Sequence, residues 1–212
     1  MLAAALVSAL VSAAAAAPNL AVRQSGSPPC YGLGGLHVYE NLSNFTLSAV
    51  NTTLPNANST GAPLVLASNN VNWIPAASTV LATYASFPPD IWSGPEFSLI
   101  NGALIPAPNG NLVGYDANVT SGYGLGFAVT DPENEQSGAE IYCVQDDGAP
   151  SGFQHAYLAV FGDTANFSLC TSLSVDAEQP PQNQVIYKAT SENNDQYDYN
   201  SCYAVQLIIQ AP

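Results

Sequence analysis

The sequence predicts an all-β fold, built as a two-sheet β-sandwich or jelly roll, with an open β-barrel as the alternative architecture. Three observations indicate this class. Short apolar runs and period-two alternation dominate the chain, and no long helical periodicity follows the first residues. The 16 glycines and 16 prolines are spread between these runs as turn residues. The dipeptide Asn101-Gly102 stands between two apolar runs, which favours a type I′ hairpin.

The chain begins with an apolar segment of targeting type. Residues 2–17 are an unbroken run of Leu, Ala, Val and Ser that ends in small residues before Pro18. This pattern predicts a secretory signal peptide over residues 1–17. The run is shorter than the roughly 20 apolar residues that a membrane-spanning helix needs. We expect residues 18–29 to be a flexible lead and residues 30–212 to form a single β-sandwich domain, because no linker composition divides them.

Twelve short strands are expected within that domain. They are rich in Val, Ile, Phe and Tyr, and clusters of Gly, Pro, Asn and Asp separate them. Their expected bounds are 45–50, 63–67, 79–84, 97–100, 103–105, 112–115, 125–130, 140–144, 157–161, 167–171, 185–188 and 203–209. A second turn at Pro108-Asn109-Gly110 follows the hairpin, so strands 97–100, 103–105 and 112–115 are expected to form a meander.

Four cysteines agree with secretion. They are Cys30, Cys143, Cys170 and Cys202. An even number in a secreted chain indicates two disulfides, and three connectivities can join four cysteines. We favour Cys170–Cys202 with Cys30–Cys143, because the first bond closes the C-terminal segment locally. No Cys/His spacing of zinc-binding type is present, so no metal or other cofactor is expected.

N-glycosylation sequons provide a further sign of the secretory route. The asparagines that head an N-x-S/T triplet are Asn41, Asn44, Asn51, Asn58, Asn118 and Asn166. Four of them fall within residues 41–58, and this clustering is more informative than their number. We expect at least two or three to carry glycans, which would keep that face from packing tightly against other proteins.

The charge balance excludes several classes of partner. Two basic residues stand against sixteen acidic ones, so the formal net charge is −14. A nucleic-acid-binding protein needs Lys and Arg to displace counterions from phosphates, and an anionic membrane surface would repel this chain. Charged residues make up 8% of the chain, so Asn, Ser, Thr and attached sugar must supply most of its hydration.

Catalytic residues are hard to assemble from this sequence. The chain has two histidines, and no nucleophile-elbow motif places a serine beside either of them. Glycoside cleavage needs two carboxylates at a set separation, and Glu96, Glu140 and Asp163 are the strand-associated candidates. No paired-carboxylate pattern joins them, so we interpret them as solvent-facing groups. Enzymatic activity is therefore not expected.

One polar segment near the C-terminus has the composition of a sugar-binding loop. Residues 192–200 are rich in Asn, Asp and Tyr. Its candidate glycan-binding residues are Asp195, Tyr197, Asp198 and Tyr199. A tyrosine ring can stack on a pyranose, while carboxylates and amides bind its hydroxyls. The competing interpretation is an ordinary solvated turn, and the same holds for three acidic clusters (131/133/135, 146/147 and 192/195/198) as Ca²⁺ ligands.

Several motifs resemble a known family. They are Pro63-Leu-Val-Leu66, Phe97-Ser-Leu-Ile-Asn-Gly-Ala-Leu-Ile-Pro106, Glu140-Ile-Tyr-Cys143, Phe167-Ser-Leu-Cys-Thr171 and Tyr197-Asp-Tyr-Asn-Ser-Cys-Tyr203. Together they resemble small secreted proteins of mushroom-forming fungi that are often labelled IgE-binding or immunomodulatory. These are distantly similar to the phialide-associated cell wall protein of moulds. The resemblance implies a secreted or wall-associated β-rich glycoprotein and supports the Cys170–Cys202 pairing, but it carries no catalytic site.

These observations lead to one expected function and two alternatives. We expect a secreted fungal cell-wall or surface glycoprotein with a structural or binding role, whose partners are cell-wall glycans or host proteins, immune components among them. The first alternative is a carbohydrate-binding, lectin-like module. The second is a β-sandwich glycosidase or lyase that acts on wall polysaccharide.

Overall fold

The computed structural model describes residues 30, 33, 37–55, 60–68, 76–86, 96–107, 111–146, 156–173 and 181–210. Strands dominate these residues, and the one short 3-10 helix, η1, spans Pro132–Asn134. The strands are β1 (His37–Tyr39), β2 (Leu42–Asn51), β3 (Ala62–Ser68), β4 (Ala76–Thr83), β5 (Glu96–Ile100), β6 (Ala103–Pro106), β7 (Val113–Asp116), β8 (Tyr123–Gly124), β9 (Gly126–Thr130), β10 (Tyr142–Asp146), β11 (Ala156–Val160), β12 (Phe167–Ser172), β13 (Asn183–Tyr187) and β14 (Tyr197–Gln210). No helix in these segments is long and apolar enough to cross a membrane.

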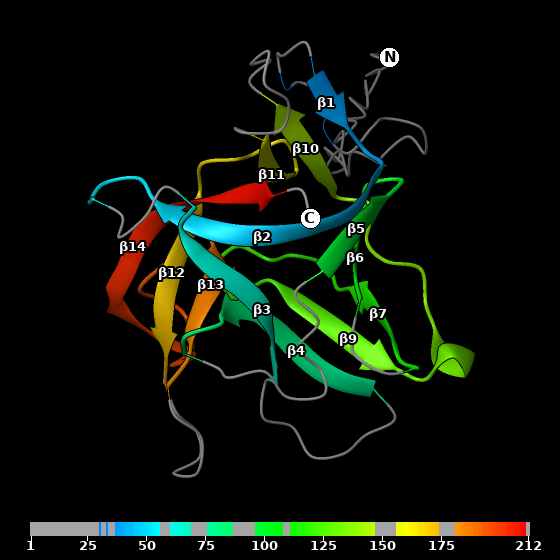
Figure 1. The fold of residues 1–212 in the computed structure, drawn as a ribbon. Coiled ribbons are helices and arrows are strands. Elements are labelled where there is room, and N and C mark those ends of the chain that lie inside the picture. Colours follow the sequence, from blue (N-terminus) through cyan, green and yellow to red (C-terminus); the bar gives the residue numbers. More distant parts are fainter. Residues whose placement is uncertain are drawn as a thin grey trace, which may run out of the picture.

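Six strands close into a barrel. Strand β14 pairs with β12 on one side and with β2 on the other, and the order β14-β12-β13-β4-β3-β2 returns to β14. All of these pairings are antiparallel. Figure 1 shows the long, curved β14 and β2 forming adjacent walls of this barrel. Closure pairs the backbone groups that the free edges of an open sheet would leave exposed.

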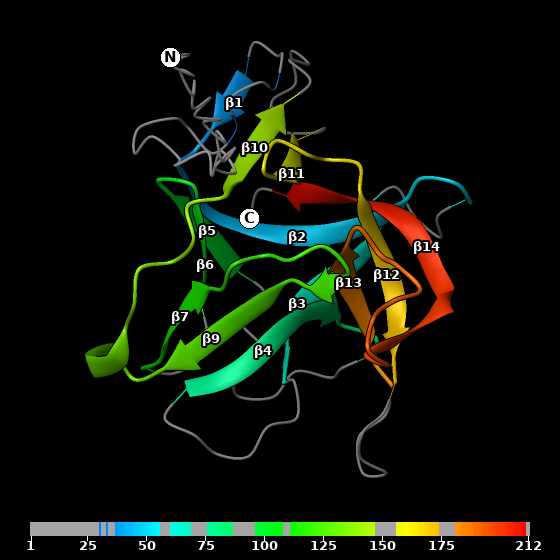
Figure 2. The ribbon, with the colours of Figure 1, turned by 180° about the vertical axis from the view of Figure 1, so that it is seen from behind.

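The remaining strands lie outside the ring and extend its walls. Strands β5 and β6 continue from β2, β9 and β7 continue from β4, and β8 pairs with β13. On another side, β11, β10 and β1 continue from β14. Figure 2 shows β1, β10 and β11 gathered at one end of the molecule, away from β7 and β9.

The all-β class predicted from the sequence is confirmed, and the architecture is the barrel that stood as the alternative to a sandwich. Each of the twelve expected strands has a counterpart; the short strands β1 and β8 were not anticipated. The hairpin is also confirmed, because Ile100 pairs with Ala103 and both Asn101 and Gly102 have positive φ, at 49° and 81°.

The expected meander is wrong in its third strand. Strand β7 pairs with β9 rather than with β6. Gly114 of β7 lies against the ring of Pro106 at the end of β6, where a Cβ would overlap that ring. Proline has no N–H to donate, so it is a poor partner for extending the ladder.

The core fills the barrel and continues beneath the outer strands. Alternate residues of each strand point inward, as Leu47 and Ala49 do on β2. Aromatic rings meet at one end, where Phe97 lies between Phe45 and Phe127 at centroid distances of 6.3 and 6.2 Å. This packing accounts for the Val, Ile, Phe and Tyr content of the expected strands.

Both favoured disulfide pairings are present. Cys30–Cys143 joins the residue-30 region to β10, where Ala159 packs beside it. Cys170–Cys202 joins β12 to β14 over a sequence separation of 32 residues. Two disulfides fit an extracellular protein, because such bonds persist in oxidising compartments.

Several sequence-based predictions fall on parts of the chain that the structure does not describe. They are the signal peptide 1–17, the lead 18–29, the turn Pro108-Asn109-Gly110 and the sequon at Asn58.

Candidate functional site

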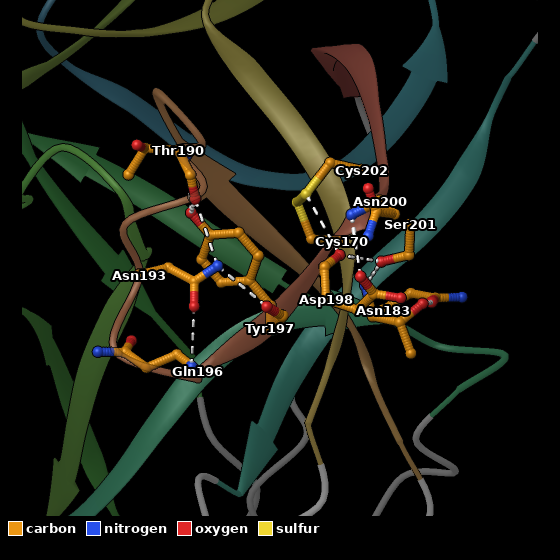
Figure 3. The surroundings of a disulfide bond; sticks show 11 residues. Cys170, Asn183, Thr190, Asn193, Gln196, Tyr197, Asp198, Asn200, Ser201 and Cys202 are labelled. Carbon is orange, nitrogen blue, oxygen red and sulfur yellow. Dashed lines mark hydrogen bonds between the residues drawn. A yellow bond between two sulfur atoms is a disulfide. The ribbon is translucent and has the colours of Figure 1, made fainter.

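The disulfide Cys170–Cys202 lies at an irregular part of the barrel wall. Leu169 pairs with Tyr203, and Thr171 pairs with Asp198. Between these two pairs β12 has one residue, Cys170, and β14 has four, so residues 199–202 form a large bulge opposite Cys170. The disulfide ties that bulge to β12 (Figure 3).

Tyr197 does not have the role that the sequence suggested. Its side chain is 2% exposed and packs with Cys170 and Ile186 on the outer face of β12 and β13. The hydroxyl donates to the Thr190 carbonyl at 3.1 Å and accepts the Thr190 N–H at 2.9 Å. Asn193 Nδ2 then donates to the Tyr197 carbonyl at 3.0 Å. The ring cannot stack on a sugar, because it is part of the core.

The other three candidate glycan-binding residues remain accessible but do not form one cluster with Tyr197. Asp195 is exposed on a tight turn with a φ of 58°. Asp198 is exposed, and its Oδ1 accepts the Asn200 N–H at 2.9 Å. Tyr199 is 46% exposed. Tyr197 is buried whereas Asp198 is exposed, so two residues that are adjacent in sequence lie in different environments (Figure 3).

Asp163 organises a turn between β11 and β12. Its Oδ1 accepts backbone N–H groups of Ala165 and Asn166 at 3.0 and 3.2 Å. Its Oδ2 accepts Asn166 Nδ2 at 2.7 Å and the Tyr187 hydroxyl at 3.2 Å, with Lys188 Nζ 3.9 Å away. The pKa of Asp163 lies below its usual value. Partial burial acts to raise it, but the hydrogen bonds that the ionised carboxylate accepts have the larger combined effect. A carboxylate so occupied is suited to structure rather than to glycoside cleavage.

The two glutamates considered for catalysis lie in exposed positions. Glu96 begins β5 and pairs with Thr46 of β2, whereas Glu140 precedes β10. Among the described residues, no three His, Cys, Asp or Glu side chains form a group that could hold a metal ion.

The least ordinary carboxylate is Asp116, which sequence reasoning missed. It is 3% exposed at the end of β7, on the same inward face as Gly114. Its Oδ1 accepts the Ala139 N–H at 2.9 Å, and a Cβ at Gly138 would overlap that oxygen. Alternation in the sequence does not reveal this position, because the apolar residues of the strand are Val113 and Tyr115, on the other face.

Two buried oxygens in this region have no hydrogen-bond partner within the described part of the chain. They are Oδ2 of Asp116 and the hydroxyl of Tyr142, whose side chain is fully buried. Burial raises the pKa of Asp116 from 3.8 to about 7, against the lowering effect of backbone hydrogen bonds that include the one from Ala139. Burial also raises the pKa of Tyr142, and the charge of Asp116 adds to that effect. The carboxyl therefore holds its proton in mildly acidic solution, and its lack of exposed surface keeps it from contacting a polysaccharide.

The structure describes five of the six sequon asparagines. Asn41, Asn44, Asn118 and Asn166 are exposed, and Asn51 is half-buried. The Oδ1 atom of Asn51 accepts the N–H groups of Thr53 and Leu54, both at 2.8 Å, which holds the turn after β2. Asn41, Asn44 and Asn118 therefore lie where a glycan could be attached, whereas the Nδ2 atom of Asn166 donates to Asp163.

No protein-family model, curated protein or solved structure matches this chain.

Proposed function

We propose that this protein is a non-enzymatic extracellular glycoprotein of cell-wall or surface type. The observation that carries the proposal is a disulfide-bonded barrel with exposed sequon asparagines on its surface. Disulfides and glycans both favour durability outside the cell, since they limit unfolding and cover the surface. The resemblance to IgE-binding and phialide-associated wall proteins of fungi supports the same role.

The carboxylates support a structural role better than a catalytic one. Asp163 is engaged by its own turn, and Asp116 is buried beneath Ala139. A glycosidase needs one carboxyl to donate a proton to the substrate and a second to act from the other side. Asp116 is too deeply buried to reach a polysaccharide, and both oxygens of Asp163 are already occupied by hydrogen bonds.

The test is to express the full chain in a secreting fungal host and follow it in medium, wall and cell fractions. We expect a disulfide-bonded product outside the cell whose mass falls on enzymatic removal of N-glycans. Asn118→Gln removes one exposed sequon and should lower the glycosylated mass by a single glycan at most. Retention inside the cell without glycans would overturn the proposal. Hydrolysis of a wall polysaccharide that is lost in Glu140→Gln would do so as well.

A further inference from the structure

One end of the barrel is lined by polar side chains that point inward. Antiparallel partners project to the same face of a sheet, so the register identifies these positions. Tyr203 and Val185 are both partners of buried Leu169, and Thr83 is the partner of buried Leu64. The last inward positions at this end are Asn51 on β2, Thr83 on β4, Thr171 on β12, Asn183 on β13 and Tyr203 on β14. We call these five residues the polar rim. The corresponding inward residue of β3 is Ala62, which is apolar and is not part of it.

The polar rim differs sharply from the next inward layers. Moving away from it, the inward residues of β12 are Leu169 and Phe167, and those of β14 are Val205 and Leu207, all 1% exposed or less. Tyr203, by contrast, is 38% exposed. The change from apolar to polar therefore coincides with a rise in exposure at Asn51, Thr171, Asn183 and Tyr203, whereas Thr83 stays buried.

A chain of hydrogen bonds holds part of the polar rim in place. The hydroxyls of Thr83 and Ser86 lie 2.9 Å apart, and Ser86 Oγ accepts the Asn183 N–H at 2.9 Å. The Thr171 hydroxyl donates to Asn183 Oδ1 at 3.2 Å, while its N–H donates to Ser201 Oγ at 2.8 Å. These bonds fix the orientation of the amide and hydroxyl groups before any ligand arrives, which lowers the entropy cost of binding.

Two hydrogen-bond donors of the polar rim have no acceptor among the residues that the structure describes. Asn183 uses its Oδ1 to accept from Thr171, but neither its Nδ2 nor the Tyr203 hydroxyl donates to another described residue. The carboxylate of Asp198 lies near this end, because Asp198 is the strand partner of Thr171 (Figure 3). Lys188, one of two basic residues in the whole chain, lies instead beside Asp163. A phosphate, sulfate or carboxylate ligand would therefore meet no opposite charge from a Lys or Arg side chain that the structure describes.

We propose that the polar rim binds an uncharged oligosaccharide. The partly exposed ring of Tyr203 provides an apolar face for a pyranose, and Asn183 and Thr171 provide amide and hydroxyl groups for its hydroxyls. This site goes beyond the wall role proposed above and differs from residues 192–200 as a whole. None of its five residues belongs to that segment, and Asp198 only lies beside the site as the strand partner of Thr171.

Binding can be tested by calorimetric titration with three uncharged probes: a β-1,3-glucan oligomer, an N-acetylglucosamine oligomer and an α-mannose oligomer. The protein is first trimmed of N-glycans, because a glycan on Asn51 would begin at this same end. We expect saturable binding of at least one probe. Tyr203→Ala and Asn183→Ala should each weaken it about tenfold, equivalent to about 1.4 kcal/mol. Tyr123→Ala is the matched control, since Tyr123 is 37% exposed on β8 and lies outside the polar rim.

A second measurement does not depend on the variants folding. In the unaltered protein, the bound probe should shift the backbone amide resonances of Thr171, Asn183 and Tyr203 and leave that of Tyr123 in place. The proposal is overturned if no probe saturates at about 10 mM, a concentration that detects even millimolar affinity. Equal effects of the Tyr203 and Tyr123 variants, or shifts confined to other residues, also overturn it. Secretion and glycosylation of the variants would be unchanged, so the wall role is tested separately.

Discussion

Replacing Asp116 with Asn should change how the stability of this protein depends on pH. The folded protein holds the carboxyl at a pKa of about 7 because the group is buried, against an ordinary value of 3.8. Between these two values the folded state binds a proton that the unfolded state releases. Stability from Asp116 is therefore fully present below about pH 3.8 and is lost as the pH rises to about 7.

The magnitude follows from those two pKa values. Their separation corresponds to about 4 kcal/mol, at about 1.4 kcal/mol per pKa unit. Between pH 4.5 and pH 7.5 the linkage relation predicts a loss of about 3 kcal/mol from the free energy of unfolding. Asn is isosteric and can still accept the Ala139 N–H through its oxygen, but it cannot ionise. The parent protein should therefore lose about 3 kcal/mol of unfolding free energy between pH 4.5 and pH 7.5 that Asp116→Asn does not lose.

Urea unfolding of both proteins at pH 4.5 and pH 7.5 measures the free energy of unfolding of each. The change between the two pH values can then be compared between the parent and Asp116→Asn. The lower pH stays above the ordinary value of 3.8, below which the stabilising hydrogen bonds to ionised Asp163 would begin to be lost. Asp131→Asn alters an exposed carboxyl and should change stability by less than about 0.5 kcal/mol at either pH. If Asp116→Asn shows the same stability difference from the parent at both pH values, the reasoning from burial is refuted.

Three further variants and one control test other parts of the structure. The double variant Cys170→Ser, Cys202→Ser opens a loop with a sequence separation of 32 and should lose about 3–4 kcal/mol in urea unfolding; an unchanged midpoint would contradict the role of this bond. Gly102→Ala places a side chain at a φ of 81° and should cost about 1 kcal/mol or more, seen as a lower Tm. Tyr197→Phe removes a buried hydroxyl with two hydrogen bonds and should lower the free energy of unfolding by about 1–3 kcal/mol. Tyr199→Phe changes an exposed residue and should leave it almost unchanged. Equal effects of the two substitutions would contradict the burial of Tyr197.

Local patterns predicted the strands of this fold well. Alternation and turn residues located β2, β5 and β6 and the Asn101-Gly102 turn, because side-chain direction in a strand depends on neighbouring residues alone. The same patterns missed β1 and β8, which contain three and two residues and are too short to show alternation. They also placed the start of β14 at residue 203, since the bulge at residues 199–202 interrupts its alternation.

The candidate site was less accessible to such reasoning. Composition favoured residues 192–200 as a polar, solvated loop, but the ring of Tyr197 covers Cys170 and Ile186. Burial of one residue in a polar segment depends on what lies across from it, and here that partner comes from β12 and β13. Asp116 was missed for the matching reason: its burial depends on the segment that contains Ala139, which is distant in sequence.

The sequence by itself determined the all-β class, the approximate positions of twelve strands and the Asn-Gly hairpin, and it favoured the two cysteine pairs that the structure contains. Each of these depends on interactions between near neighbours or on a small set of pairing choices. Only the tertiary structure decided that β14 pairs with both β12 and β2, which closes the barrel and gathers the polar rim at one end, and that Asp116 and Tyr142 are buried. Closure and burial are set by contacts between strands far apart in the chain, and no local pattern carries that information.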